Sequence, residues 1–173
     1  MRFWRIYDLI EQGLALLALF VLVASVLAAG IGRSFGVPLM AAPQYAQLAL
    51  IWACMLGADV AARNGSHIRV GAVFDALPGA GRAALTLISL GLVFPFLGFI
   101  AWHGIDLAQG NWRRELGASG LSYGLVTLAL PVGAILLAVS LLRRLVAVGL
   151  AGVFDGTTPL DPQTDKDTKE AVL

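Results

Sequence analysis

The chain of 173 residues contains 58% hydrophobic and 13% charged residues, and its formal net charge is +1. This composition leaves too little polar surface to cover a soluble globule of this length. The chain also has no basic stripe with interleaved aromatic residues, which argues against a nucleic-acid partner. Its one cysteine, Cys54, excludes a disulfide within the chain. We therefore expect an all-α integral membrane protein with four transmembrane helices and short amphipathic interfacial helices.

The first twelve residues predict an interfacial helix. Apolar residues fill the positions between four charged residues that recur at steps of three: Arg2, Arg5, Asp8 and Glu11. The alternative is an ordinary charged terminus in front of a span. Residues 13–32 form the first expected span, because about 20 residues at roughly 1.5 Å each cross a hydrocarbon core of about 30 Å. This apolar run is too long for the core of a cleaved signal peptide, and two acids precede it.

Residues 44–62 form the second expected span, which ends in the first charges after a long apolar run. Asp59 and Arg63 are four residues apart with the acid first, which is the favourable order for an ion pair on one helical face. The helix should end there, because the turn residues of 64–66 follow. Apolar residues then recur at helical spacing over 68–77, which predicts a short helix on the membrane surface.

Two further spans follow, and each contains a proline that should kink it, Pro95 and Pro131. The tail over 149–173 is too polar to pack, and we expect it to be disordered. The expected membrane domain comprises residues 13–148 and holds four spans: 13–32, 44–62, 83–103 and 121–142.

The distribution of basic residues predicts the orientation of the spans, since four spans place both termini on one side. Seven arginines flank the membrane on that side: Arg2, Arg5, Arg63, Arg69, Arg82, Arg143 and Arg144. Three lie in the opposite loops: Arg33, Arg113 and Arg114. The excess of basic residues therefore places both termini, and the loop after the second span, in the cytoplasm.

Asp59, His103 and Asp106 lie near predicted helix ends, and the four apolar cores between the ends contain no Lys, Arg, Asp, Glu or His. A charge at membrane depth costs at least about 2.5 kcal/mol and is kept only for a function. Common catalytic and nucleotide-binding motifs are absent, and so are the paired broken helices of transporters that bind substrate at the midplane. We therefore expect no enzyme activity, no catalytic residue and no metal site.

Two classes of function remain, a scaffold for membrane partners and a helical anchor of a redox enzyme that holds haem or quinone. In the predicted orientation His67 and His103 lie on opposite sides of the membrane, too far apart to ligate one haem iron. The Soret band of haem in an absorption spectrum would distinguish the two classes.

Small residues recur at every fourth position in the first two spans, a spacing that lets helices approach closely. The first row is Ala24, Ala28, Gly32 and Gly36, and the second, the candidate helix-partner face, is Ala49, Ala53, Gly57 and Ala61. The alternative is that a chain this rich in Ala and Gly produces such rows by chance.

Several motifs follow one another around the end of the second span. Trp52 precedes a Leu-Gly-Ala step and then an Arg-x-x-x-His-Ile-x-Val pattern, and Pro131 lies in a later Leu-Pro-Val-Gly stretch. This order resembles the small membrane subunit, of the DctQ type, of tripartite ATP-independent periplasmic (TRAP) transporters. The positions that carry the resemblance are Trp52, Gly57, Arg63, His67, Ile68, Val70 and Pro131. The chain departs from the family at the start of the second span, where Gln44 and Tyr45 follow a proline and the family often has a Glu.

The resemblance implies a multi-pass protein of the bacterial inner membrane, the small scaffold subunit of a sodium-coupled secondary transporter that imports organic acids such as dicarboxylates or sugar acids. The implied partners are a large permease subunit, which carries substrate and sodium, a periplasmic substrate-binding protein and the membrane lipid. No cofactor is implied. A fixed scaffold agrees with the empty apolar cores, because the residues that recognise the substrate then belong to other chains.

Overall fold

The computed structural model describes residues 2–63 and 79–149. Within these ranges the chain forms four helices, α1 (Arg2–Ser34), α2 (Ala42–Arg63), α4 (Gly79–Gly110) and α5 (Gly124–Val148). Each is long and apolar enough to cross a membrane, which confirms the predicted all-α, four-span fold class. Outside the described residues lie the surface helix predicted over 68–77, the tail from residue 150, and the motif residues His67, Ile68 and Val70.

Helix α1 passes without a break through the boundary that the sequence predicted near residue 12. It has 33 residues, so it is about 50 Å long and exceeds the hydrocarbon core of about 30 Å. Gly13 does not end it, because one glycine inside a helix costs only about 1 kcal/mol. The predicted interfacial helix and first span are therefore parts of one helix. The position of the first twelve residues at the membrane surface stays a prediction.

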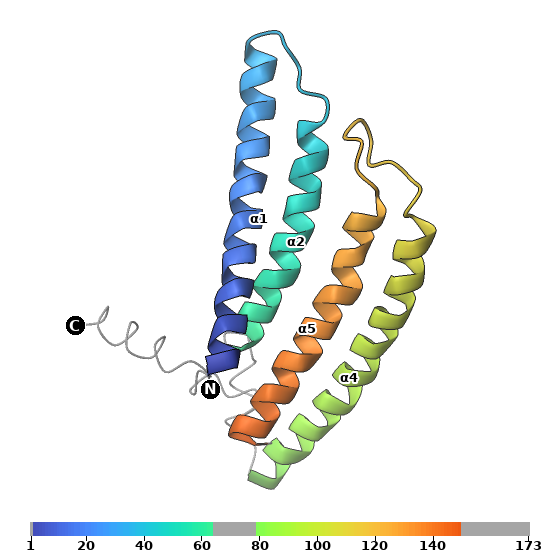
Figure 1. Cartoon of the computed structure of the whole chain (residues 1–173). Coiled ribbons are helices and arrows are strands. Elements are labelled where there is room, and N and C mark those ends of the chain that lie inside the picture. Colours follow the sequence, from blue (N-terminus) through green and yellow to red (C-terminus); the bar gives the residue numbers. More distant parts are fainter. Residues whose placement is uncertain (1, 64–78, 150–173) are drawn as a thin grey trace, which may run out of the picture.

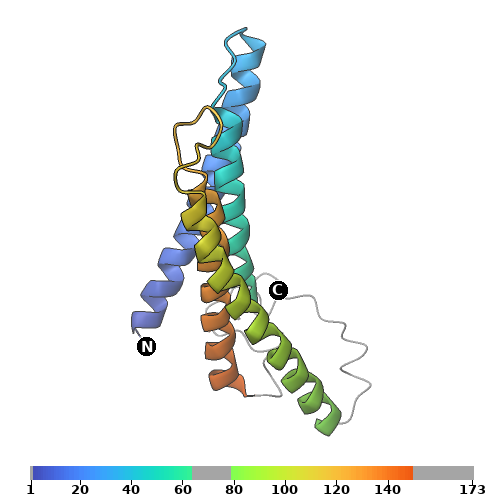
Figure 2. The same cartoon turned by 90° about the vertical axis from the view of Figure 1, so that its right-hand side faces the viewer.

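The helices lie side by side in a row, in the order α1, α2, α5, α4 (Figure 1), because α2 contacts both α1 and α5 whereas α4 contacts α5. The two edge helices, α1 and α4, run opposite to the two central ones. In the view turned by 90°, the first turns of α1 and of α4 diverge on opposite sides of the row (Figure 2). The start of α1 and the ends of α2 and α5 therefore lie together at one end of the row, measured along the helix axes.

Close contacts of α5 depend on glycine. A Cβ added at Gly104 of α4 would lie 2.9 Å from Cδ of Pro131, and one added at Gly133 would lie 2.8 Å from Sδ of Met55 in α2. Helices α4 and α5 both continue through their prolines, and the Pro131 side chain is fully buried. The hydrophobic core between these two helices is centred on Leu97, Ala134 and Leu141.

The connection between α4 and α5 folds into a small hairpin. The backbone N–H of Leu116 donates to the carbonyl of Leu121 at 2.7 Å. The Tyr45 hydroxyl, near the start of α2, donates to the carbonyl of Ser119 at 3.2 Å. This hydrogen bond attaches the hairpin to α2 at the end of the row opposite the start of α1.

Candidate functional site

Charged side chains of three helices meet where α1 starts and where α2 and α5 end. We call this set the ionic junction; it consists of Asp8 and Glu11 from α1, Asp59 and Arg63 from α2, and Arg143 and Arg144 from α5. The junction thus contains three acids and three arginines. Opposite charges that meet in this way offset much of the cost of removing each of them from water.

Arg63 is the centre of the junction, and only 4% of its surface is exposed. Its guanidinium donates to Asp8 through Nη1, and to Glu11 Oε2 through Nη2 at 2.5 Å. Its Nε lies 3.2 Å from Oδ2 of Asp59, which confirms the ion pair that the four-residue spacing predicted. The planar guanidinium suits this position because its donors diverge in fixed directions and serve several acceptors at once.

Two arginines of α5 extend the junction to a third helix. Arg143 donates from Nη1 to Asp8 Oδ1 at 2.8 Å and from Nη2 to Oδ2 at 3.4 Å, and its guanidinium carbon lies 3.9 Å from the ring centre of Trp4. Arg144 donates to the carbonyl oxygen of Arg63 at 2.9 Å. This bond satisfies a carbonyl at the end of α2, where the helix dipole also favours a cation.

The sequence predicted one pair of this junction and missed the rest. Asp8 and Glu11 were expected to face the membrane surface, whereas Glu11 is 4% exposed and contacts α2. Asp59 was expected to pair at the edge of the hydrocarbon, and it is fully buried within the protein. The sequence contained a signal for the whole junction. Four antiparallel spans place the start of α1 beside the ends of α2 and α5, and the charges of the junction lie within about three turns of these helix ends.

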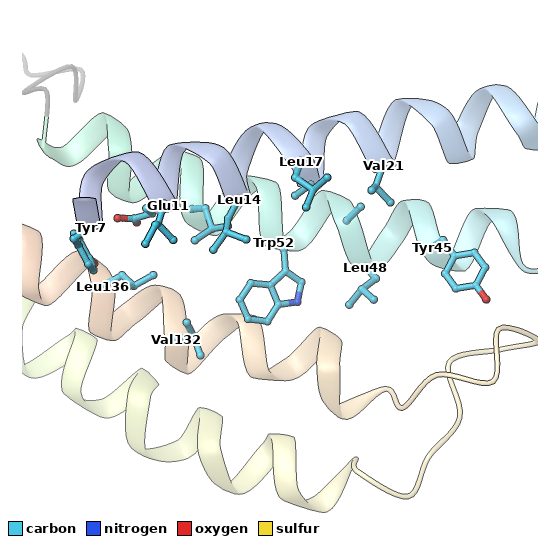
Figure 3. A pocket seen from close by; sticks show the side chains of 14 residues that line it. Tyr7, Glu11, Leu14, Leu17, Val21, Tyr45, Leu48, Trp52, Val132 and Leu136 are labelled. Atoms are coloured by element: carbon cyan, nitrogen blue, oxygen red, sulfur yellow. The ribbon is translucent and has the colours of Figure 1, made fainter. Parts of the chain in front are cut away.

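An apolar groove runs beside the junction, over α2 and between α1 and α5 (Figure 3). Its volume is about 480 Å³. Tyr7 and Glu11 lie at the end next to the junction, and Tyr45 lies toward the other end. Leucine and valine side chains dominate the lining, including Leu14, Leu17, Val21, Leu48, Val132 and Leu136. Such a surface fits hydrocarbon better than a charged solute, which would need convergent polar groups.

Trp52, one of the family-motif residues, projects from α2 into this groove (Figure 3). Its indole Nε1 donates to the backbone carbonyl of Leu125 in α5 at 3.1 Å. This bond satisfies the single donor of the indole and joins the two central helices. Trp52 therefore has a positioning role in the fold. Pro131, a second motif residue, has a comparable role through its contact with Gly104.

The small residues of the row on α2 differ in how far this chain buries them. Ala49 is 6% exposed and lines the groove, whereas Gly57 is exposed and a Cβ there would meet no atom within 4 Å. Ala53 and Ala61 are half-buried. Each step of four residues advances the helix by about 40° beyond a full turn, so the row turns by about 120° from first to last. Leu50 is also exposed and lies on the same side of α2 as Gly57.

Gln44 stands where the family often has a Glu, and it contacts the α4–α5 hairpin. Gly117 in the hairpin has a φ of +55°, and a Cβ added to it would lie 2.6 Å from the Gln44 amide group. Both the positive φ and the close approach require glycine. The start of α2 therefore holds the hairpin through neutral side chains, Gln44 and Tyr45.

Of the two histidines, His103 lies in the described part of the chain. His103 is exposed on α4, its ring stacks on Phe99 at 4.1 Å, and its Nδ1 lies 3.2 Å from the Phe99 carbonyl oxygen. His67 lies outside the described residues. Within residues 2–63 and 79–149, no three His, Cys, Asp or Glu side chains form a group that could hold a metal ion.

Comparison with known proteins gives consistent matches. The family described as "Tripartite ATP-independent periplasmic transporters, DctQ component" matches residues 22–148. The chain is 27% identical over 128 residues to the sialic acid TRAP transporter small permease protein SiaQ of Vibrio cholerae, a match that covers 73% of this chain and 74% of that protein. It is 29% identical over 166 residues to the ectoine TRAP transporter small permease protein TeaB of Halomonas elongata, which covers 92% and 85%.

Proposed function

Because a match over residues 22–148 shows that the chain belongs to the DctQ family of small TRAP permease subunits, we propose that it is the non-catalytic scaffold of such a transporter. Small permease subunits of this family function with a large permease subunit and a periplasmic substrate-binding protein. The chain is a multi-pass protein of the bacterial inner membrane. We also propose that the transporter takes up an organic acid together with sodium. Both termini of this chain lie in the cytoplasm in the proposed orientation.

The observation that supports the scaffold role is the pairing of charged side chains with one another. Six charged side chains of α1, α2 and α5 contact one another at the ionic junction, whereas Arg33 is exposed in the last turn of α1. The groove between these helices is lined mainly by apolar side chains over most of its length. A carrier of organic acids needs polar or ionisable groups that are free to bind its substrate near the midplane.

The relatives support the proposal that this subunit does not determine which substrate the transporter carries. One is named for sialic acid and the other for ectoine, although both are similar to this chain over most of its length. Small subunits of similar sequence therefore belong to transporters named for different solutes. This is expected when the subunits that bind the solute are other chains, and it supports assigning substrate recognition here to the partners.

Transport assays test the scaffold role. The purified chain, reconstituted alone into vesicles with a sodium gradient, should give no uptake of dicarboxylates or sugar acids. Vesicles that contain the chain together with its large permease subunit and binding protein should give uptake, which serves as the matched control. Reproducible gradient-dependent uptake by the chain alone would refute the proposal.

The anchor of a redox enzyme remains the competing function, and no observation in the described residues favours it. An absorption spectrum of the protein purified from its native membrane decides between the two. We expect no Soret band. A stoichiometric haem would replace the scaffold proposal with the redox one.

The side of α2 that carries Gly57 is the proposed contact with the large permease subunit. Gly57 is exposed and has open space around it within this chain, so a neighbouring helix can approach its backbone closely. Ala49, the first residue of the small-residue row, is buried by this chain itself. The proposed contact is therefore restricted to the part of the row around Gly57.

A further inference from the structure

A cavity separate from the groove over α2 lies where the start of α1 meets the end of α5. Its volume is about 460 Å³, and no residue lines both cavities. The lining consists of one aromatic, one charged and four aliphatic side chains: Trp4 from α1, and Val139, Leu142, Arg143, Val146 and Ala147 from α5. Leu142, Val146 and Ala147 are exposed. The cavity is therefore accessible from outside the chain and is apolar except for one guanidinium.

Arg143 is held in place where it lines this cavity. Its Nη1 and Nη2 atoms donate to Asp8 at 2.8 and 3.4 Å, and its guanidinium carbon lies 3.9 Å from the ring centre of Trp4. A guanidinium carries five N–H donors, so the two bonds to Asp8 leave donors for a further acceptor. The side chain is 17% exposed, so such an acceptor can approach it from the cavity. Arg143 thus offers a preorganised cation to a ligand.

The position of the cavity along α5 matches the boundary between lipid headgroups and hydrocarbon. Arg143 lies five residues before the end of α5 at Val148, which is about 8 Å along the helix axis. Toward the middle of the helix, Val139 and Ile135 precede it at steps of four on the same side, and Ile135 is exposed. Trp4 adds an indole, a side chain that is enriched at membrane interfaces. A ligand bound here therefore meets a cation near the membrane surface and an apolar track that leads inward.

The charges at this end of the row favour an anionic ligand. The ionic junction balances three acids with three arginines. Arg2 and Arg5, in the first turns of α1, add positive charge, and the described parts of α1, α2 and α5 contain no further acid near this end. A soluble anion would leave the apolar walls uncovered, and a purely apolar ligand would leave the guanidinium without an acceptor besides Asp8. A cation beside an apolar track fits a phospholipid, and basic pockets between membrane helices bind anionic headgroups in this way.

We propose that this cavity binds one anionic phospholipid of the leaflet that surrounds the start of α1. The headgroup phosphate accepts hydrogen bonds from Arg143, and an acyl chain covers Val139 and Leu142. The lipid contacts α1 through Trp4 and α5 through the other lining residues, so it fills the space between an edge helix and a central one. The site belongs to this chain alone and does not depend on the scaffold role or on the proposed orientation.

Native mass spectrometry of the full chain in detergent micelles tests the site. The chain is titrated with phosphatidylglycerol, which is anionic, and with phosphatidylethanolamine of the same acyl chains, which is zwitterionic. The first phosphatidylglycerol should bind about fivefold more tightly than the first phosphatidylethanolamine, the preference expected from one arginine beside the headgroup. Arg143→Gln should abolish this preference. Equal binding of the two lipids by the wild-type chain would overturn the proposal.

A second variant tests the cavity without touching the bond between Arg143 and Asp8. Val146 is 81% exposed, so Val146→Glu places a carboxylate in the cavity without disturbing the packing, and it should also abolish the preference for phosphatidylglycerol. The matched control is Ile6→Glu, the same change of charge at an exposed apolar residue that lies about 200° around α1 from Trp4. This control should keep the preference. A preference that survives Val146→Glu, or one that Ile6→Glu abolishes equally, would refute the site, and this comparison decides alone if Arg143→Gln does not fold.

Discussion

Replacement of Arg63 by Met tests whether the ionic junction holds the helices together. The change keeps most of the apolar stem and removes the guanidinium that contacts Asp8, Glu11 and Asp59. Asp8 keeps Arg143 as a partner, whereas Glu11 and Asp59 lose the cation that they share. Removing one partner of a buried ion pair costs about 3 to 5 kcal/mol, because the other charge stays buried without compensation. Both remaining acids are nearly or fully buried, so little screening by solvent reduces this cost.

The assay is reversible unfolding of the full chain in lipid–detergent micelles, followed by circular dichroism during a titration with a denaturing detergent. We expect the free energy of unfolding to fall by about 3 to 5 kcal/mol for Arg63→Met. The matched control Arg113→Met, at an exposed arginine of the hairpin, should change it by about 0.5 kcal/mol or less.

A rescue variant distinguishes lost charge compensation from lost packing. Glu11→Gln and Asp59→Asn, added to Arg63→Met, remove the uncompensated charges and should recover at least half of the lost stability. Arg63→Lys should fall between wild type and Arg63→Met, because an ammonium is a point charge that cannot reproduce the planar fork. A loss below about 1 kcal/mol for Arg63→Met, or a triple variant no more stable than the single one, would refute the proposed role of the junction.

Two further predictions concern the orientation of the chain and its contact with the large subunit. In a Cys54→Ser background, a cysteine at Ser119 should react with an impermeant thiol reagent on intact cells and one at Ser66 should not; the reverse pattern would invert the proposed topology. Gly57→Leu should weaken copurification of the large permease subunit by roughly 5- to 150-fold in the association constant, because overpacking of a close contact costs about 1 to 3 kcal/mol. Gly98→Leu, at an exposed glycine of α4 that also has open space around it, is the control, and full retention of the partner by Gly57→Leu would remove this face from consideration.

The four spans could be predicted because each depends on local information. A run of about 20 apolar residues is long enough to cross the membrane whatever its neighbours are, so the sequence alone is sufficient to identify it. The Asp59–Arg63 pair was predictable for the same reason, since a spacing of four residues places both side chains on one helical face. The family could be recognised because its motifs lie close together around Arg63.

The remainder of the ionic junction depends on contacts between distant parts of the chain. Asp8 and Arg143 are 135 residues apart, and Glu11 and Arg63 are 52 apart. The spacing of three residues places Asp8 and Glu11 on neighbouring positions of one side of α1, but it does not show whether that side faces headgroups or other helices. The order of the helices in the row decides this, because α2 lies beside α1 and presents Arg63 to it. The number of charges at the helix ends predicts the orientation of the spans, but it does not show which charges meet.

A row of helices held by a few polar contacts is suited to a scaffold in a membrane. Lipid tails are as apolar as leucine, so an edge helix such as α1 loses little by exposing its side chains, and no hydrophobic drive folds the row into a compact bundle. The specific contacts must then fix the positions of the helices: the ionic junction joins α1 to α2 and α5, the Trp52 indole joins α2 to α5, and the Gly104–Pro131 contact joins α5 to α4. Each of these contacts lies between neighbouring helices of the row. A subunit built in this way can hold a partner in place without moving, which is the property that a fixed scaffold requires.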